Sequence, residues 1–406
     1  MHPISHPQDS CLACGSRELV DLIDLGVQPH ANDFSDTQQL KFRESLRLRG
    51  CAHCGHAQQA VFVRPEILFA DYHYASGTSR SLKAYFDRYA AELASQFSSD
   101  ASILEVACND GSFLDSLAAQ GFGALHGVDP ATNIVAGVRA KGLDVDADFF
   151  NLAYAAAHPR RYDLIVGQNV LAHTPDPLDL LSAAAAVLKD DGEIHIQTSQ
   201  ANMLFNGEFD TVYHEHYSFF GAHSMRTLAR HAGLVLVRLS YPEVHGTSFR
   251  FVLKKAGSAD ASVTERLAYE VEQGLLDGRC FAAFSALAEN RVAAYRGHLH
   301  DWHAAGRTVV GVGVAAKSVT FFNYAGVFPD HVVDEAPLKI GKYLPGSAVR
   351  VAAVAGVADY PEGAVFVVGA WNFFAELKDK ISAARGAKGG RDLYVRYLPA
   401  LEMQPC

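Results

Sequence analysis

A crowded run of ionisable side chains stands at residues 209–220, which read FDTVYHEHYSFF. Its centre is the tetrad Tyr213, His214, Glu215 and His216. Imidazole, carboxylate and phenol groups serve as general acids and bases, and imidazole also binds metals. A zincin needs HExxH, whereas Ser218 stands four residues after His214, and a zinc deaminase needs a downstream C-x-x-C pair. The spacing therefore favours an acid/base centre, with a metal site and a buried polar turn as open alternatives.

Two C-x-x-C pairs, Cys11–Cys14 and Cys51–Cys54, lie near the N-terminus. Two such pairs can supply four thiolates to one tetrahedral zinc, which makes the site structural because no ligand position stays open. The segment around them is too short for a large hydrophobic core, so a metal would stabilise its fold. His53 and His56 are close enough in sequence to replace a cysteine as ligand.

One nucleotide-like pattern is the apolar run 102–107 followed by Cys108-Asn109-Asp110-Gly111 and a helical pattern. A small-residue loop of this kind brings the backbone close to a ligand at the carboxyl edge of a parallel sheet. Asp129 ends the next predicted strand, where a carboxylate can accept hydrogen bonds from two ribose hydroxyls. Because no glycine-rich phosphate cradle is present, the pattern fits S-adenosylmethionine.

A second pattern, Gly311-Val-Gly313-Val-Ala-Ala316, matches G-x-G-x-x-A, and Asp334 follows about 20 residues later. This match supports a rival function, an oxidoreductase that uses NAD. Lys317 follows the loop, and its ammonium group could equally bind the diphosphate of a nucleotide sugar at the start of a helix.

The elements around these residues follow an α/β pattern. Apolar runs at 102–107, 124–129, 162–167 and 192–198 alternate with helical patterns, which is typical of parallel strands buried on both faces. A helical pattern then runs from Ser262 to about Ala304, and a second alternation of strands and helices follows it. We therefore predict a zinc-binding domain in residues 1–70, a Rossmann-like domain in 71–256 and a second Rossmann-like domain in 257–406.

Whole-chain properties narrow the class of protein. The chain of 406 residues is too long for one ordinary core. Its formal net charge of −10 argues against nucleic acid or an anionic membrane as a partner. The N-terminus lacks the pattern of a secretory signal, and no window approaches the roughly 18 apolar residues of a membrane span. We expect a cytoplasmic protein, in which paired cysteines bind metal and do not form disulfides.

Taken in order, these residues resemble the bacterial sugar C-methyltransferases, which use S-adenosylmethionine to methylate a carbon of a nucleoside-diphosphate 4-ketohexose. The resemblance covers nearly the whole chain. It rests on the cysteine pairs and on LGVQPHANDF, EVACNDGSFLD, NVLAHTPDP, FDTVYHEHYSFF, EVHGTSFRF, GVAAKSVTFFNYAG, VDEAPLKIGKYLPG and AWNFFAEL. It implies a class I methyltransferase domain and a C-terminal domain that binds the nucleotide sugar, and we expect a monomer.

The resemblance also implies roles for single residues. His216 would be the base, oriented by Glu215, with Tyr213 as a donor to the ketone or enolate oxygen. His173 would be a second polar group, and His214 is the alternative base. Cofactor contacts are implied at Glu105, Ala107, Asn109, Gly111, Asp129, Asp148, Phe149 and Asn169. Substrate contacts are implied at Tyr72, Tyr74, Lys317, Asn323, Trp371 and Asn372.

Two residues depart from the family pattern. Ala107 stands where the cofactor loop usually has its first glycine, and Thr247 stands where a second glycine often follows His-Gly. One added methyl group should be tolerated in the loop, whereas Thr247 puts the identity of the sugar in doubt. Besides the oxidoreductase, the alternatives are a sugar O-methyltransferase, which needs no proton abstraction from carbon, and a scaffold without catalytic activity.

Overall fold

The computed structural model describes residues 3–69, 80–199, 201–244 and 246–406. Packing divides the chain into two compact units. The first unit contains Met1–Val20, Gly50–Ala201 and Glu215–Asp277, and the second contains Asp21–Arg49, Asn202–His214 and Gly278–Cys406. The chain crosses from one unit to the other inside the tetrad, between His214 and Glu215. The domain boundaries near residues 70 and 256 stay predictions, because compactness alone does not define a domain.

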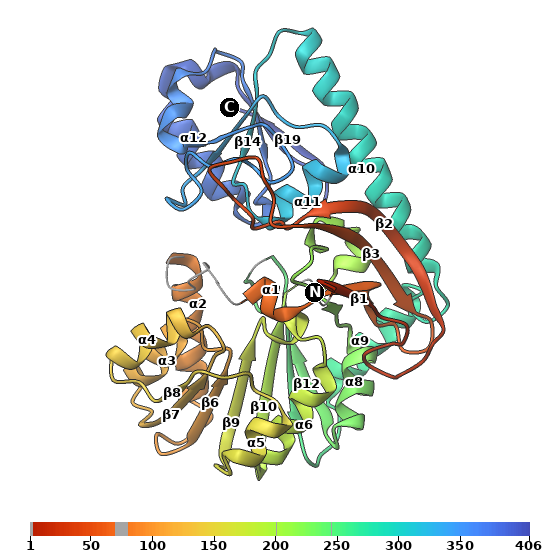
Figure 1. Cartoon of the computed structure of the whole chain (residues 1–406), viewed down its shortest axis with the longest axis vertical. Coiled ribbons are helices and arrows are strands. Elements are labelled where there is room, and N and C mark those ends of the chain that lie inside the picture. The colour runs from red at the N-terminus through yellow and green to blue at the C-terminus, as the bar shows by residue number, and fades with distance from the viewer. Residues whose placement is uncertain (1–2, 70–79, 200, 245) are drawn as a thin grey trace. The chain divides into compact units, whose positions relative to one another are not determined.

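The main sheet of the first unit has the strand order β12-β13-β10-β9-β6-β7-β8 (Figure 1). The strands are β6 (Ser102–Val106), β7 (Ala124–Val128), β8 (Val145–Asp146), β9 (Tyr162–Gln168), β10 (Leu188–Thr198), β12 (Val235–Ser240) and β13 (Phe249–Lys254). β6 to β10 are parallel to one another, and β13 is antiparallel to β10 and β12. The order reverses between β6 and β9, so ligands are expected outside the carboxyl ends of these two strands.

Helices cover both faces of this sheet. They are α2 (Arg80–Ala94), α3 (Ser112–Ala119), α4 (Thr132–Ala140), α5 (Leu152–Ala157), α6 (Pro177–Val187), α8 (Ala222–His231) and α9 (Ala261–Glu272). Side chains from α2, α3 and α4 form one hydrophobic cluster, and side chains from α5, α6 and α8 form another. Successive residues of β9 alternate between the clusters, with Leu164 and Val166 in the first and Ile165 in the second. This alternation explains why the strand reads as a continuous apolar run.

The N-terminal part of the first unit consists of short strands. β1 (Ser5–Pro7) pairs antiparallel with β5 (Val61–Val63), β4 (Ala57–Gln59) pairs with β11 (Ser218–Phe219), and α1 spans Pro65–Phe69. β2 (Leu19–Pro29) and β3 (Arg43–Cys51) have most of their residues in the second unit. The cysteine-bearing turns join the same hydrophobic cluster as α6 and α8, so this part shares a core with the main sheet.

The second unit contains another parallel sheet, in the order β16-β15-β14-β17-β18-β19. The strands are β14 (Val309–Val312), β15 (His331–Asp334), β16 (Val351–Ala353), β17 (Val365–Val368), β18 (Leu393–Arg396) and the antiparallel β19 (Glu402–Pro405). Its α-helices are α7 (Met203–Asn206), α10 (Arg279–Ala304), α11 (Ala316–Ala325) and α12 (Phe374–Arg385). Its short 3₁₀ helices are η3 (Phe209–Thr211), η4 (Val354–Asp359), η5 (Trp371–Phe373) and η6 (Gly386–Arg391), and the first unit contains η2 (Leu171–His173). The order reverses between β14 and β17, which creates a second switch point.

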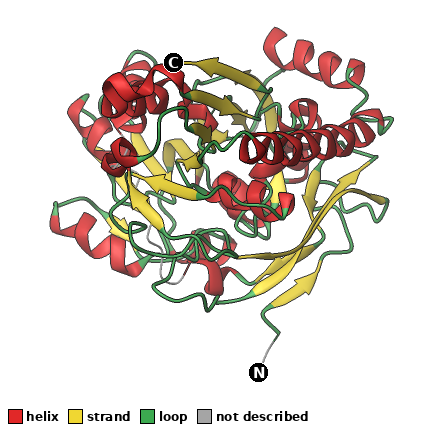
Figure 2. Ribbon diagram, turned by 90° about the horizontal axis from the view of Figure 1, so that it is seen from above, coloured by secondary structure: helices red, strands yellow, loops and turns green. Residues whose placement is uncertain are grey.

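The helical pattern predicted from Ser262 to about Ala304 corresponds to two separate helices, α9 and α10. Gly274 and Gly278, with φ of 77° and 79°, stand between them, and a right-handed helix cannot continue through such backbone angles. The 26 residues of α10 form a long rod (Figure 1, Figure 2). In the part of the chain that the structure describes, none of the helices is both long and apolar enough to span a membrane.

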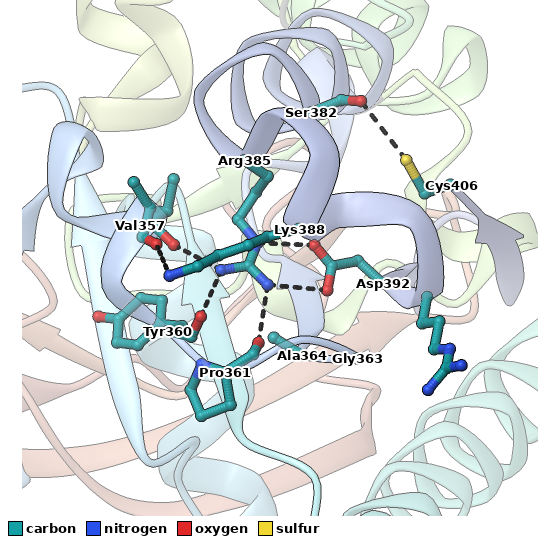
Figure 3. Close-up of polar contacts among 12 residues, drawn as sticks. Val357, Tyr360, Pro361, Gly363, Ala364, Ser382, Arg385, Lys388, Asp392 and Cys406 are labelled. Carbon is teal, nitrogen blue, oxygen red and sulfur yellow. Dashed lines mark hydrogen bonds and ion pairs between the residues drawn. The ribbon is translucent and has the colours of Figure 1, made fainter.

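A buried ion pair between Arg385 and Asp392 lies within the second unit (Figure 3). Arg385, in the last turn of α12, donates from Nε and Nη2 to Asp392 at 2.7 and 3.1 Å. Its remaining N–H groups bind the carbonyl oxygens of Val357, Tyr360 and Pro361. Because every donor of the buried guanidinium is satisfied, the ion pair ties α12 to η4 and η6 with no uncompensated charge.

Candidate active site and metal centre

The loop after β6 has the backbone of a ligand-binding turn. Ala107 and Asn109 have positive φ angles of 59° and 48°, a conformation that L residues seldom adopt. The amide of Ala107 donates to the carbonyl of Val128 at 2.7 Å, which ties the loop to the end of β7. Gly111 precedes α3, and a Cβ atom there would lie 2.7 Å from Val138. The glycine usual in the family at position 107 thus corresponds to a left-handed residue, so Ala107 keeps the loop shape at a cost in strain.

Acidic side chains gather beside this loop. Asp129 accepts hydrogen bonds from the amides of Asn109 and Ala131, both at 2.9 Å, which fixes its carboxylate. Burial raises the pKa of Asp129, and those amide donors partly oppose the shift. Burial, with Asp129 and Asp110 nearby, raises the pKa of Glu105 well above its ordinary value. The site fits S-adenosylmethionine, because Asp129 keeps lone pairs for ribose hydroxyls.

The other predicted cofactor residues follow parallel strands at the same edge of the sheet. Asn169 follows β9 with φ of 56°, and its side-chain oxygen accepts from the amide of Ser199 at 3.2 Å. Its own amide donates to Gln197, so it joins the ends of β9 and β10. Asp148 and Phe149 follow β8, and the Phe149 residue is 46% exposed. An exposed ring at this edge is available to pack against a ligand.

The tetrad forms a turn between η3 and β11, so its two histidines do not share the face of a strand. His214 is fully buried in the second unit, where its Nε2 lies 3.2 Å from the carbonyl oxygen of Glu44 and its ring packs edge-on against Phe42. His216 lies in the first unit, with its ring centroid 4.7 Å from that of His173. His214 therefore has the surroundings of a structural residue, whereas His216 faces another candidate catalytic group.

His173 ends η2, directly after β9, at the switch point of the first sheet. Burial lowers the pKa of His173, while the Glu215 carboxylate and a hydrogen bond to the Glu215 backbone oppose this shift. The imidazole is therefore neutral at pH 7 and can donate a hydrogen bond. Its Nδ1 makes no hydrogen bond with any residue in the described ranges.

Hydrogen bonds hold His216 and Tyr217 in place within the first unit. Gln59 of β4 donates from its side chain to the carbonyl of His216 at 2.7 Å. The amide of Tyr217 donates to Ala172 at 2.8 Å, and its phenol donates to Val63 at 2.5 Å. Glu215 is buried, and Tyr213 is partly exposed in the second unit. The predicted substrate residues Tyr72 and Tyr74 lie outside the described residues.

At the switch point of the second sheet, the structure brings together several predicted substrate residues. Lys317 is the second residue of α11, and its Nζ lies 4.2 Å from the centroid of the Trp371 ring in η5. Gly313 has φ of 71°, and a Cβ atom there would lie 2.8 Å from that of Ala370. Asn372 follows Trp371 at the same edge and is partly buried. The glycine loop therefore lets β14 and β17 bring Lys317 and Trp371 into contact.

Asp210 also belongs to this group, and sequence reasoning missed it. It is 1% exposed, and its Oδ2 accepts from the indole nitrogen of Trp371 at 2.8 Å. Burial raises its pKa to about 7, opposed by Lys317 and by the hydrogen bond from Trp371. The one available signal was an acid beside aromatic residues in FDTVYHEH.

Asn323 uses its side-chain N–H groups within the second unit. Its side-chain nitrogen donates to the carbonyls of Val319 and Pro345, at 2.9 and 3.0 Å, which leaves an acceptor and no donor for a diphosphate. Pro345 lines a cavity of about 560 Å³ within the second unit, together with Asp33, Phe42 and Tyr343. Asn323 thus holds a residue that lines this cavity.

If the chain were an oxidoreductase, Asp334 would be the acid that binds ribose, and it already has hydrogen-bond partners within the protein. Asp334 accepts from the amide of Ala336 at 2.8 Å and lies 3.3 Å from Nζ of Lys339. Lys339 also donates to the carbonyl of Val314, inside the glycine loop, at 3.2 Å. A cation therefore bridges the loop and the acid where an adenosine would bind.

The four cysteines converge on one point. Their sulfur atoms all lie within 4.8 Å of one another, with Cys11 to Cys54 at 3.5 Å and Cys14 to Cys51 at 3.6 Å. A tetrahedral zinc with bonds of about 2.3 Å requires sulfur separations of about 3.8 Å, so the cluster fits the metal. His56 is not part of it, because its Nε2 lies 3.3 Å from the Ser218 hydroxyl and its ring packs against Phe220. These thiolates hold a structural zinc.

Comparison with known proteins identifies the chain's class. Residues 11–69 match a family of zinc binding domains, residues 74–239 match a methyltransferase domain, and residues 243–399 match the C-methyltransferase C-terminal domain. The chain is a methyltransferase that uses S-adenosylmethionine. The C-methyltransferase NovU of Streptomyces niveus is 28% identical over 400 residues, which cover 93% of each chain. The predicted class, the class I methyltransferase fold with its flanking domains, and both cofactors are confirmed.

Other methyltransferases match a smaller part of the chain. The ubiquinone biosynthesis O-methyltransferase of Hydrogenovibrio crunogenus is 29% identical over 198 residues, which cover 44% of this chain and 80% of that protein. The crystal structure of magnesium protoporphyrin IX methyltransferase (ChlM) from Synechocystis PCC 6803 with bound SAM covers 43% of this chain and 79% of its own, with 14% identity and a TM-score of 0.33.

Proposed function

We propose that the enzyme methylates a carbon beside the ketone of a nucleoside-diphosphate 4-ketohexose. Bound S-adenosylmethionine supplies the electrophilic methyl group. The observation that carries the proposal is the contact of His216 with His173 at the switch point of the sheet whose loops fit that cofactor. An imidazole at this edge can remove a proton from carbon, a step that methylation of oxygen does not need.

The chemistry explains why several polar groups are required. The proton beside a ketone has a pKa of about 19 and imidazole about 6.5, a gap of roughly 17 kcal/mol at about 1.36 kcal/mol per unit. A positioned base contributes about 10²- to 10⁴-fold, and each donor to the enolate oxygen contributes about 3 to 4 kcal/mol. One histidine alone is therefore insufficient.

The residues divide this work. His216 accepts the α-proton, and the electron pair of the broken C–H bond moves onto the ketone oxygen. The neutral His173 donates a hydrogen bond to the resulting enolate, and Glu215 orients and stabilises the protonated imidazole. The carbon of the enolate is then the nucleophile. Location in the cytoplasm and a monomeric state stay predictions.

The nucleotide part of the substrate would bind to the second sheet. Lys317 stands at the first turn of α11, where the helix dipole also favours negative charge, and Trp371 and Asn372 follow the adjacent β17. The Lys317 ammonium would bind the diphosphate.

Proton exchange tests this proposal. With S-adenosylhomocysteine bound in heavy water, the wild type should exchange the α-proton of a 4-ketohexose nucleotide, and His216→Asn should not. His214→Asn is the matched comparison, and it should exchange while its melting temperature falls. Undiminished exchange in His216→Asn would remove His216 as the base. A panel of 4-keto nucleotide sugars would identify the sugar, and methylation without any exchange would point to an oxygen acceptor.

A further inference from the structure

We infer that Asp210 is a positioning residue, which holds Trp371 and, through its ring, the ammonium group of Lys317 in place for the diphosphate of the substrate. The inference rests on the proposed function, because it assumes that Lys317 binds a diphosphate. It goes further by giving a role to a residue that contacts no substrate.

The hydrogen bond between Asp210 and Trp371 is deeply buried. The side chains come from η3 and η5, 161 positions apart, and the donor–acceptor distance is 2.8 Å. The other oxygen, Oδ1, is buried and has no hydrogen-bond partner among the residues the structure describes. A carboxylate satisfied on one side is costly to bury, which indicates that it is retained for function.

Trp371 contacts both Asp210 and Lys317. The lysine Nζ lies 4.2 Å from the centroid of the indole ring, in cation–π contact. An oxygen acceptor on the indole N–H makes the ring face more negative, which strengthens its attraction for the ammonium. A lysine side chain loses rotamer entropy when it is ordered, so an ammonium held in place before binding meets the diphosphate at lower cost.

The segment that carries Asp210 is fixed independently of Trp371. Phe209 stacks on Phe321 of α11 with ring centroids 5.6 Å apart. The carbonyl of Gly207 accepts from Arg291 of α10 at 2.7 Å. Gly207 has φ of 63°, and a Cβ atom there would lie 2.6 Å from that of Leu287, so only glycine fits against the helix. Asp210 is therefore the anchored member of the group, and Trp371 and Lys317 are positioned by it.

Binding of thymidine diphosphate and uridine diphosphate, measured by titration calorimetry on the full chain, tests the inference. Asp210→Ala should weaken binding of the preferred diphosphate about tenfold, since the hydrogen bond is lost. Asp210→Asn should stay within about threefold of the wild type, because the amide oxygen still accepts from the indole. Trp371→Phe should weaken diphosphate binding as much as Asp210→Ala does. The double variant should lose no more affinity than either single variant.

The outcomes separate the inference from the proposed function. Affinity for S-adenosylhomocysteine, whose site lies in the first unit, should be unchanged in every variant and reports folding. Normal diphosphate binding by Asp210→Ala overturns the inference and leaves the proposed function intact. Equal losses in the Ala and Asn variants overturn positioning through the hydrogen bond. A wild type that binds neither diphosphate overturns the proposed function and the inference together. If Asp210→Ala does not fold, Trp371→Phe provides the test. Diphosphate affinity equal to that of the wild type in Trp371→Phe overturns the inference.

Discussion

The imidazole rings of His173 and His216 meet edge to face, with centroids 4.7 Å apart and planes at 70°. The two residues reach this contact from different segments, since His173 ends η2 after β9 and His216 precedes β11. Burial lowers the pKa of His173, so its ring is neutral at pH 7 and remains a donor. The pair thus combines a base with a neutral donor, which is what formation of an enolate requires.

His173→Asn should therefore lower turnover and exchange of the α-proton together, by about 10²- to 10³-fold, the usual effect of losing one donor to an oxyanion. Binding of S-adenosylhomocysteine should be unchanged. His231→Asn, at the exposed end of α8, is the matched control and should behave as wild type. Steady-state kinetics and exchange followed by NMR supply the measurements, and full turnover by His173→Asn would exclude it from the reaction.

Loss of zinc should affect the active site as well as the fold. Cys11, Cys51 and Cys54 belong to the same hydrophobic cluster as α6 and α8, and β4 follows the second pair directly. β4 also carries Gln59, which holds the carbonyl of His216. The binding free energy of a structural zinc, about 10 to 16 kcal/mol, contributes directly to folding.

Cys51→Ser should accordingly lose the zinc, reduce the soluble yield and lower activity. Metal content by mass spectrometry of the purified protein measures the effect. Cys406→Ser removes an exposed cysteine far along the chain and should keep one zinc per molecule. A folded Cys51→Ser protein that lacks metal and retains full activity would contradict a structural site.

Patterns set by local chemistry could be predicted from the sequence. The apolar runs at 102–107, 124–129, 162–167 and 192–198 correspond to β6, β7, β9 and β10, because strands buried on both faces leave no alternation. The C-x-x-C pairs predicted the cysteine cluster for a similar reason, since metal ligation requires that spacing.

Contacts between distant segments could not be predicted. Asp210 and Trp371 are separated by 161 positions, and no local pattern marks them as partners. The surroundings of His214 and His216 depend on Phe42 and on His173, which the order of residues in the tetrad does not encode. The break between α9 and α10 was missed because glycines near a helix end interrupt the backbone without changing the apolar pattern.

Ala107→Gly should stabilise the enzyme. Ala107 has φ of 59°, and a left-handed conformation costs a residue with a Cβ atom about 1 kcal/mol relative to glycine. The melting temperature of the transition that includes the first unit should rise by about 2 to 4 °C, as measured by calorimetry. Asn109→Gly is the matched control, since asparagine at φ of 48° tolerates this conformation better and should gain less. A fall in stability for Ala107→Gly would show that the methyl group packs favourably.

Asp210→Asn should change how stability depends on pH. Burial raises the pKa of Asp210 from 3.8 to about 7 in the folded state, so the folded protein binds this proton more tightly than the unfolded chain. The carboxyl group therefore destabilises the fold increasingly as pH rises from about 4 to about 7, by up to about 4 kcal/mol at about 1.36 kcal/mol per unit. Asparagine does not titrate, so the variant should gain free energy of unfolding relative to the wild type between pH 5 and pH 8. Urea denaturation of both proteins at several pH values measures this difference, and a difference independent of pH would mean that Asp210 is ionised throughout.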